Sequence, residues 1–230
     1  VSLVLSAWPR PALWLDEAQS IAIARGDPSG IVTRLRADGA PPLYYGLLGV
    51  WMTVFGTGDN SVRLLSTLFA MAALVALWLL ASRIAGSAGA ALALLTVAAN
   101  PFFVRYASEA RMYSLVLLEV CLALLALDGW LRHGRGGDLV GFTLVTVALM
   151  YTHYWGLYAW LACVLCVTGA WFVAGAERRL RLSGALWALV TAAVLWLPWV
   201  PVARYQSAHT GTPWSEPPTL LSALNVVVHR

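Results

Sequence analysis

The feature that most constrains this chain is a series of apolar segments nearly long enough to cross a lipid bilayer. About 20 residues of helix span the hydrocarbon core. Hydrophobic residues make up 60% of the chain and charged residues 11%, against about 45–50% and about 25% in soluble domains. We therefore expect an all-α, polytopic membrane protein. The expected spans lie near residues 62–82, 88–105, 113–131, 139–154, 157–175 and 184–203.

Arginine residues set the expected orientation of these spans. All 15 basic residues are arginine, and short arginine-rich links stay on the cytoplasmic side of a membrane. The links around Arg83, Arg132 and Arg179 are therefore predicted to be cytoplasmic. The net charge of +4 indicates loops that face anionic lipid headgroups, not a nucleic acid. The outer face then holds residues 9–61, the corners at 106–113 and 152–156, and the segment 204–230.

The apolar segment Pro41–Phe55 would reverse the later orientations if it crossed the membrane. Its helix would reach only about 22 Å against a core of about 30 Å, so we predict a helix that lies at the membrane interface. A Pro-Pro start suits a first helical turn, and Tyr44 and Trp51 suit an interfacial position. The loop 9–61 is thus expected to hold two helices, this one and an earlier helix from Asp16 that ends at Gly26.

The two ends of the sequence suggest a truncated chain. Val1–Trp8 is apolar but too short to span, so we interpret it as the end of a severed first span, a stub over residues 1–8. A cleaved signal peptide is the alternative, although a charged leader and a small-residue cleavage site are not seen. We expect one transmembrane catalytic domain over residues 1–230.

Eight polar residues are expected to converge at the outer ends of the spans. Ionisable groups at membrane depth cost about 2.5–3.5 kcal/mol each, so such a cluster predicts a functional site. A carboxylate there can act as a general base or a metal ligand, and an arginine can neutralise a phosphate. This combination suits the transfer of a sugar from a lipid phosphate. The residues are Asp16, Glu17, Asp38, Arg63, Glu109, Arg111, His153 and Tyr154.

Each of these residues also has an ordinary structural interpretation. Asp16 can cap the helix that follows it, with Glu17 in the first turn. Arginines near the ends of spans can be interface anchors, which applies to Arg63 and Arg111 and more strongly to Arg105. Asp16 is therefore open to two interpretations when it is considered alone.

Other isolated polar side chains are weaker candidates. His153 can be a packed, hydrogen-bonded histidine or a ligand contact. Glu119 lies inside a span, where a neutral or paired carboxyl between helices is favoured. Cys121, Cys163 and Cys166 are odd in number, and the last two sit in an apolar run, so packing is favoured over a zinc or redox role.

Four segments in order resemble the dolichyl-phosphate-mannose-protein mannosyltransferase family, glycosyltransferase family 39, and the related aminoarabinose transferases of the C-type glycosyltransferase fold. On this resemblance Asp16 is the catalytic carboxylate and Glu17 its acidic neighbour. Arg63 matches an arginine after the Phe-Gly turn, and Glu109 and Arg111 match a second acidic corner. The segments are LWLDEAQSIAIARG, DGAPPLYYGLLGVWMTVFGTGDNSVRLLSTLFA, ANPFFVRYASEARMYSL and YTHYWG.

The chain departs from the family pattern at Ala40, where relatives have a histidine before Pro-Pro. The resemblance implies that the role of this histidine is either absent or taken over by a neighbour such as Asp38. In relatives a metal sometimes assists, but the sequence does not offer a dense ligand set, so the cofactor is left unknown.

The resemblance implies a glycosyltransferase that inverts the anomeric centre. The donor is a polyprenyl-phosphate sugar, with mannose as the first expectation, and the acceptor is a hydroxyl group on protein, lipid or glycan. The expected location is the outer face of a plasma membrane, and the arginine-only, alanine-rich composition indicates a GC-rich bacterium. The alternatives are a multi-pass transporter or flippase and a noncatalytic assembly partner.

Overall fold

The computed structural model describes residues 13–26 and 30–210. Every secondary-structure element in these ranges is helical. The expected stub 1–8 and the residues after 210 lie outside them. The helices are α2 Leu15–Ala24, α3 Ile31–Asp38, α4 Leu43–Phe55, α5 Asp59–Ala98, α6 Pro101–Tyr106, α7 Tyr113–His133, α8 Gly136–Thr152, α9 Trp155–Val173, α10 Ala176–Trp196 and α11 Val200–His209, with a 3-10 turn at Leu197–Trp199.

Four helical stretches in the described part of the chain are long and apolar enough to cross a membrane. They are Asp59–Ala98, Tyr113–His133, Trp155–Val173 and the continuous stretch Ala176–His209. At most a third of the most apolar window of each is buried within the protein, which leaves apolar faces for lipid. The predicted all-α, membrane-spanning class is confirmed. Helix α8 is also apolar but has 17 residues.

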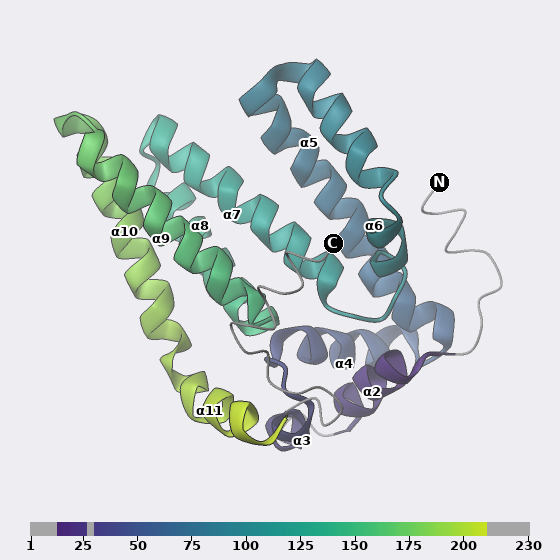
Figure 1. Cartoon of the computed structure of the whole chain (residues 1–230). Helices are drawn as coiled ribbons and strands as arrows, with labels where there is room; N and C mark the ends of the chain where they lie inside the picture. The colour runs from purple at the N-terminus through teal and green to yellow at the C-terminus, as the bar shows by residue number, and fades with distance from the viewer. Residues whose placement is uncertain (1–12, 27–29, 211–230) are drawn as a thin grey trace, which may run out of the picture.

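Helix α5 contains the expected span 62–82 and residues 88–98 of the expected span 88–105, whose remainder falls in α6 after a break at residues 99–100. The backbone at Gly86 leaves the helical region, with φ 68° and ψ −176°, a conformation essentially reserved for glycine. The two halves of α5 therefore run in opposite directions (Figure 1). The link predicted near Arg83 is thus a reversal made by one glycine.

The longer helices form a row in which α7 packs against α5 and α8, α8 packs against α10, and α10 packs against α9 (Figure 1). Buried residues between α7, α8 and α10 include Ala123, Phe142 and Leu189. A Cβ at Gly156 would lie 2.5 Å from the carbonyl oxygen of Leu149. Glycine thus permits the tight turn from α8 to α9, which carries His153 and Tyr154.

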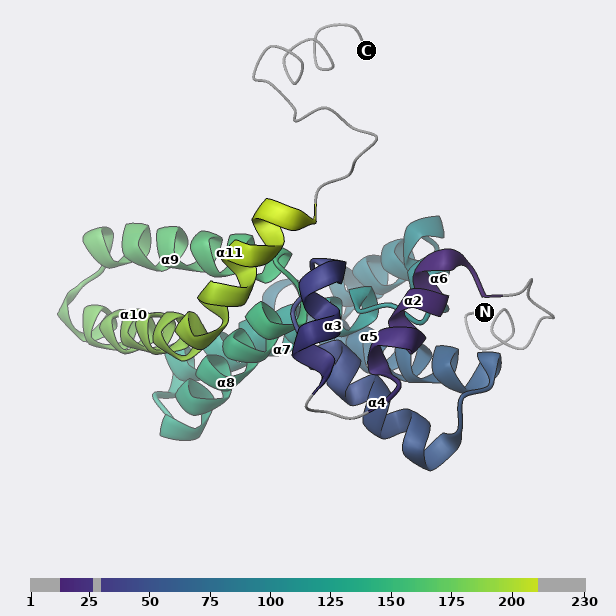
Figure 2. The same ribbon diagram turned by 90° about the horizontal axis from the view of Figure 1, so that it is seen from below.

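The predicted outer loop contains three helices, not the two that were expected. Helices α2, α3 and α4 gather at one end of the row (Figures 1 and 2). The additional helix is α3, whose Leu35 is fully buried. Helix α4 crosses the ends of the longer helices, and its 13 residues make it about 20 Å long. Its predicted position on one side of a membrane stays a prediction.

The last described helices close over this end of the protein. Pro198 and Pro201 fall where α10 gives way to the 3-10 turn and then to α11, because proline cannot continue the hydrogen bonding of a helix. Gln206 of α11 is buried and donates to the carbonyl oxygens of Leu35 at 2.7 Å and Ala40 at 3.0 Å. These bonds attach α11 to the segment that joins α3 to α4.

Candidate active site

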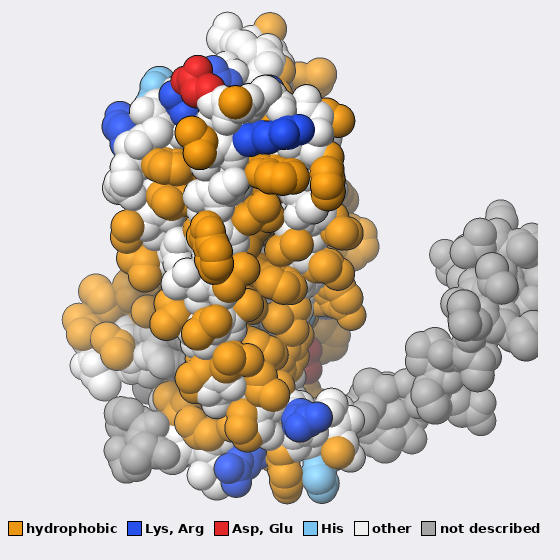
Figure 3. All heavy atoms as spheres, turned by 90° about the vertical axis from the view of Figure 1, so that its left-hand side faces the viewer, with side chains coloured by type: hydrophobic (Ala, Val, Ile, Leu, Met, Phe, Trp, Pro, Cys, Tyr) orange, Lys and Arg blue, Asp and Glu red, His pale blue; other side chains and the backbone are white. Residues whose placement is uncertain are grey.

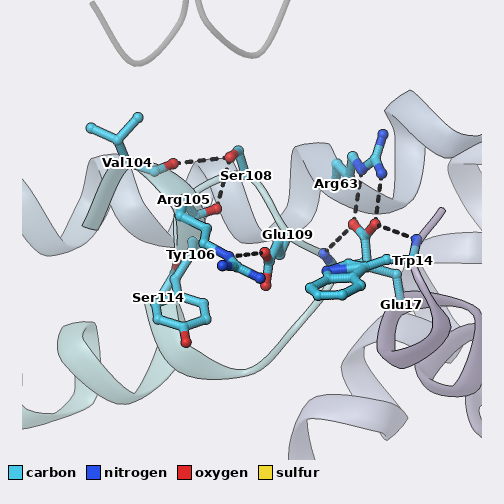
Figure 4. A network of polar contacts seen from close by, with 10 residues as sticks. Trp14, Glu17, Arg63, Val104, Arg105, Tyr106, Ser108, Glu109 and Ser114 are labelled. Atoms are coloured by element: carbon cyan, nitrogen blue, oxygen red, sulfur yellow. Dashed lines mark hydrogen bonds and ion pairs between the residues drawn. The ribbon is translucent and has the colours of Figure 1, made fainter. Parts of the chain in front are cut away.

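A bidentate ion pair between Glu17 and Arg63 lies at the centre of the polar cluster (Figure 4). The Nε of Arg63 donates to Oε1 of Glu17 at 2.8 Å, and Nη2 donates to Oε2 at 2.6 Å. The backbone amide of Ala110 donates to Oε1 at 3.0 Å. The glutamate is 1% exposed and Arg63 is 9% exposed, so the pair joins α2, α5 and the 106–113 corner largely away from solvent.

Glu17 also caps its own helix. It is the third residue of α2, and it accepts a hydrogen bond from the backbone amide of Trp14, the N-cap residue, at 3.3 Å. Burial favours a higher pKa for Glu17, but hydrogen bonds from Arg63, Ala110 and Trp14 outweigh burial and hold the pKa below its ordinary value. The carboxylate is therefore ionised and fully engaged, which fits a positioning residue better than a base.

Asp16 has the opposite environment. Its side chain is exposed and makes no hydrogen bond or ion pair within the described ranges. It lies in the electrostatic field of Arg105 and Arg111. The capping interpretation of Asp16 does not hold, because the N-cap position belongs to Trp14 and the capping carboxylate is Glu17. Asp16 is thus a carboxylate available to an incoming group.

Arg111 carries a guanidinium group that no carboxylate pairs with in the described chain. Its Nη1 lies 3.4 Å from Oγ of Ser20, and its Nε is buried without a hydrogen-bond partner there. Its Cζ lies 5.9 Å from the centre of the Tyr113 ring. The hydroxyl of Ser66 donates to the Arg111 carbonyl oxygen at 3.1 Å, which fixes this backbone against α5. A buried donor without a partner is costly, so Arg111 favours an anionic ligand.

Glu109 pairs with Arg105 and not with Arg111. The Nε of Arg105 lies 2.7 Å from Oε1 of Glu109, and its Cζ lies 5.2 Å from the centre of the Trp14 ring. The Arg105 side chain is 53% exposed and that of Glu109 is 15% exposed. Figure 4 shows this second pair beside the first. Glu109 is therefore neutralised at the edge of the cluster.

Asp38 is held by two neutral donors. The hydroxyl of Tyr45 donates to it at 2.7 Å, and the side-chain amide of Gln19 donates at 2.6 Å. Tyr45 is fully buried, and burial together with the charge of Asp38 raises the pKa of Tyr45. The tyrosine is therefore a permanent hydrogen-bond donor. No arginine pairs with Asp38 in the described part of the chain, so its two hydrogen bonds come from neutral groups.

The 152–156 corner contributes one residue to the cluster and directs another elsewhere. The ring of His153 lies against Tyr113, with 5.9 Å between ring centres. Burial and then the charge of Arg111 lower the pKa of His153, so the imidazole is neutral near pH 7. The hydroxyl of Tyr154 donates to Gln206 and accepts a hydrogen bond from the indole of Trp199. Tyr154 thus fastens α11, and its predicted substrate contact stays a prediction.

Comparison with known proteins identifies the family of this chain. A family model described as dolichyl-phosphate-mannose-protein mannosyltransferase matches residues 39–201. The chain belongs to this mannosyltransferase family. The resemblance found in the sequence is thereby confirmed, and the chain is a membrane protein of the glycosyltransferase class. No curated protein and no solved structure matches the chain.

The matched region contains only part of the cluster. It includes Arg63, Glu109, Arg111 and His153, whereas Asp16 precedes residue 39. The family match therefore establishes the class of protein. The roles of residues in α2 are inferred from their geometry.

Four contributors to the cluster of this mannosyltransferase family member were not predicted from the sequence. They are Gln19, Ser20, Tyr45 and the backbone amide of Ala110. Ser20 lies one helical turn after Asp16, so helical spacing could have indicated it. Nothing in the sequence indicates the amide of Ala110, because it depends on how the 106–113 corner folds.

The described residues do not offer a metal ion a ligand cluster. No group of three or more histidine, cysteine or acidic side chains in ranges 13–26 and 30–210 could hold one.

Glu119, the acidic residue inside α7, accepts a hydrogen bond from Thr152 at 2.8 Å and leaves Oε2 buried without a partner in the described chain. Glu119 is therefore an isolated carboxyl between α7 and α8, outside the polar cluster.

Proposed function

We propose that this protein transfers a sugar from a polyprenyl-phosphate donor to a hydroxyl acceptor at the outer face of a bacterial plasma membrane. The observation that carries the proposal is the contrast within the cluster. Arginine neutralises Glu17 and Glu109, whereas the Asp16 carboxylate and the Arg111 guanidinium are unpaired in the described chain. A base and an anion-binding group therefore face a substrate together.

The donor phosphate is assigned to Arg111. Its Nε is unsatisfied, and burial strengthens its attraction to an anion. Arg63, which the sequence also suggested for the phosphate, already donates through Nε and Nη2 to Glu17. We therefore assign Arg63 and Glu17 to positioning. The polyprenyl tail of the donor would lie along the apolar faces of the spans.

The general base is assigned to Asp16. Its carboxylate takes the proton of the acceptor hydroxyl as that oxygen attacks the anomeric carbon. The bond from this carbon to the phosphate oxygen breaks, and the electron pair leaves with the phosphate, whose added charge Arg111 stabilises. Attack opposite the leaving group inverts the anomeric centre. The two groups are close enough to interact, since the charge of Asp16 helps to stabilise the Arg111 cation.

Two further residues are assigned to the sugar. Tyr45 and Gln19 hold the orientation of the Asp38 carboxyl group, so it can accept a hydrogen bond from a sugar hydroxyl. His153 has a lowered pKa and is a neutral hydrogen-bonding group near Arg111. Its ring does not compete with Arg111 for the phosphate charge.

Transport is the second candidate function, and the buried Glu119 favours it. An acidic residue inside a span commonly marks an ion pathway, and one oxygen of Glu119 has no partner in the described chain. Its bond from Thr152 also fits a protonated carboxyl that joins α7 to α8. The transport hypothesis therefore rests on one residue, whereas the transferase hypothesis rests on the whole polar cluster.

The test is a transfer assay with the full-length protein in vesicles. Radiolabelled polyprenyl-phosphate mannose is the first donor to try, because the family description names mannose. Labelled sugar should move to an acceptor, and the product should have the opposite anomeric configuration. Transport of a solute without transfer from any polyprenyl-phosphate sugar would overturn the proposal. A product with the same anomeric configuration as the donor would contradict a direct attack of the acceptor oxygen on the anomeric carbon.

A further inference from the structure

An apolar groove lies between α9 and α10, far from the polar cluster. Its volume is about 290 Å³, and it is lined by Trp171, Ser183, Leu186, Trp187 and Val190. The indole of Trp171 donates to the Ser183 hydroxyl at 3.0 Å, so the wall toward α9 is fixed. Trp187 is 71% exposed and Val190 49% exposed. The groove is therefore open along the exposed side of these two helices.

A guanidinium group stands at the head of this groove. Arg179 precedes Ser183 by one helical turn on α10, and its Cζ lies 5.1 Å from the centre of the Trp171 ring. Its Nε and Nη2 donate to the carbonyl oxygens of Trp171 and Phe172, both at 3.1 Å. Nη1 is not used in these bonds. The arginine thus caps the end of α9 and keeps an edge for an anion.

The surroundings of Arg179 combine charge with exposed apolar groups. Arg178, the preceding residue, is exposed and has no hydrogen bond or ion pair in the described part of the chain. Phe172 is 66% exposed and Val173 87% exposed at the end of α9. Figure 3 views the side of the protein on which α9 and α10 lie, and shows a hydrophobic middle with basic side chains at its ends.

We infer that this groove binds an anionic phospholipid. One acyl chain would lie in the groove, and the phosphate would bind Nη1 of Arg179. A free phosphate would leave the apolar groove unfilled, and an uncharged lipid would leave the arginines without an anion. A ligand with a phosphate and an apolar chain satisfies both parts.

This site is separate from the proposed donor site. His153 precedes the start of α9, and Arg179 caps the end of that helix. The 19 residues of α9 place the two sites about 28 Å apart along the helix. The inference does not depend on the proposed transferase function.

The test is native mass spectrometry of the full-length protein, purified in detergent and offered phosphatidylglycerol and phosphatidylcholine in equal amounts. The wild type should retain phosphatidylglycerol preferentially. Arg179→Gln removes the charge, and Val190→Trp fills the groove without changing the arginines. Arg179→Gln should lower retention about tenfold, the scale of one charge-assisted contact, and Val190→Trp should lower retention because the acyl chain no longer fits. Arg135→Gln is the matched control, because this exposed arginine at the same end pairs with Asp138 outside the groove, and it should retain lipid as the wild type does.

Four results would overturn the inference. They are equal retention of the two lipids, loss of binding in Arg135→Gln as large as in Arg179→Gln, full retention in Val190→Trp, and displacement of phosphatidylglycerol by soluble glycerol 3-phosphate. Because Arg179 also caps α9, the thermal unfolding of each variant is measured without lipid. If Arg179→Gln is unstable, Val190→Trp decides the question.

Discussion

Arg63 donates hydrogen bonds to both carboxylate oxygens of Glu17, although 46 residues separate them in the chain. Through this pair the first turn of α2 is fixed to α5, and the amide of Ala110 adds the 106–113 corner to the same carboxylate. The neighbouring Asp16 is thereby held in a defined position while its own side chain stays exposed. In our proposal these adjacent acidic residues have separate tasks, Glu17 a structural one and Asp16 a chemical one.

Glu17→Gln should destabilise the protein by about 3–5 kcal/mol, because it leaves the buried Arg63 charge without its carboxylate. Thermal and chemical unfolding of the full-length protein in detergent measures the change. Glu109→Gln is the control, since its partner Arg105 is largely exposed and such pairs contribute about 0–1 kcal/mol. Equal stability of the two variants would contradict a structural role for the Glu17 pair.

The stability of the wild type should fall as the pH drops below the ordinary pKa of Glu17, 4.5. The pKa of Glu17 in the folded protein lies below its ordinary value of 4.5, since hydrogen bonds from Arg63, Ala110 and Trp14 outweigh the effect of burial. A lowered pKa gives stability that is present above the ordinary value and lost as the pH falls through the folded value. Unfolding measured from about pH 5 to about pH 3 should show a steeper loss in the wild type than in Glu17→Gln. Parallel curves would show that another group is responsible.

Arg111→Gln should weaken donor binding. The loss of one charge-assisted hydrogen bond, about 1.5–3 kcal/mol, corresponds to about a 10- to 100-fold rise in the apparent KM for the polyprenyl-phosphate sugar. Arg36→Gln is the control, because Arg36 is exposed on α3 and contacts the ring of Tyr205. If the donor KM is the same in Arg111→Gln as in the wild type, the phosphate is bound elsewhere.

Gly86→Ala should destabilise the protein by about 1–3 kcal/mol, because a Cβ is strained at φ 68° and ψ −176°. Gly137→Ala is the matched control, since Gly137 lies in the first turn of α8 with open space around its Cα. Unfolding of both variants in detergent provides the comparison. A neutral Gly86→Ala would show that the reversal within α5 does not need glycine.

Much of the fold follows from hydropathy, because each long apolar window must become a helix that buries its backbone polar groups. The window at 113–131 corresponds to α7, Tyr113–His133. Helix α3 was missed because its eight residues, IVTRLRAD, bury only Leu35 and give little periodicity. Helix α11 was missed because Pro198 and Pro201 interrupt an apolar stretch that reads as continuous.

The cluster itself was only partly predictable. Positive-inside orientation brings the polar corners to one end, but it does not say which acidic residue meets which arginine. That choice depends on where α2 begins. A start at Leu15, with Trp14 as N-cap, turns Glu17 inward and Asp16 outward, and a change of one residue in the start would rotate both side chains by about 100°. The pairing of Glu109 with Arg105, one helical turn away, was also not foreseen.

The measurement that tests the central claim most directly is the turnover of Asp16→Asn in the vesicle transfer assay, beside the wild type and Asp138→Asn. Asp138 pairs with Arg135 at the far end of the helices, so its variant should match the wild type. Removal of a general base should lower kcat by at least about a hundredfold, with little change in the donor KM. If Asp16→Asn transfers sugar as fast as the wild type, Asp16 is not the base and this account of the site is wrong.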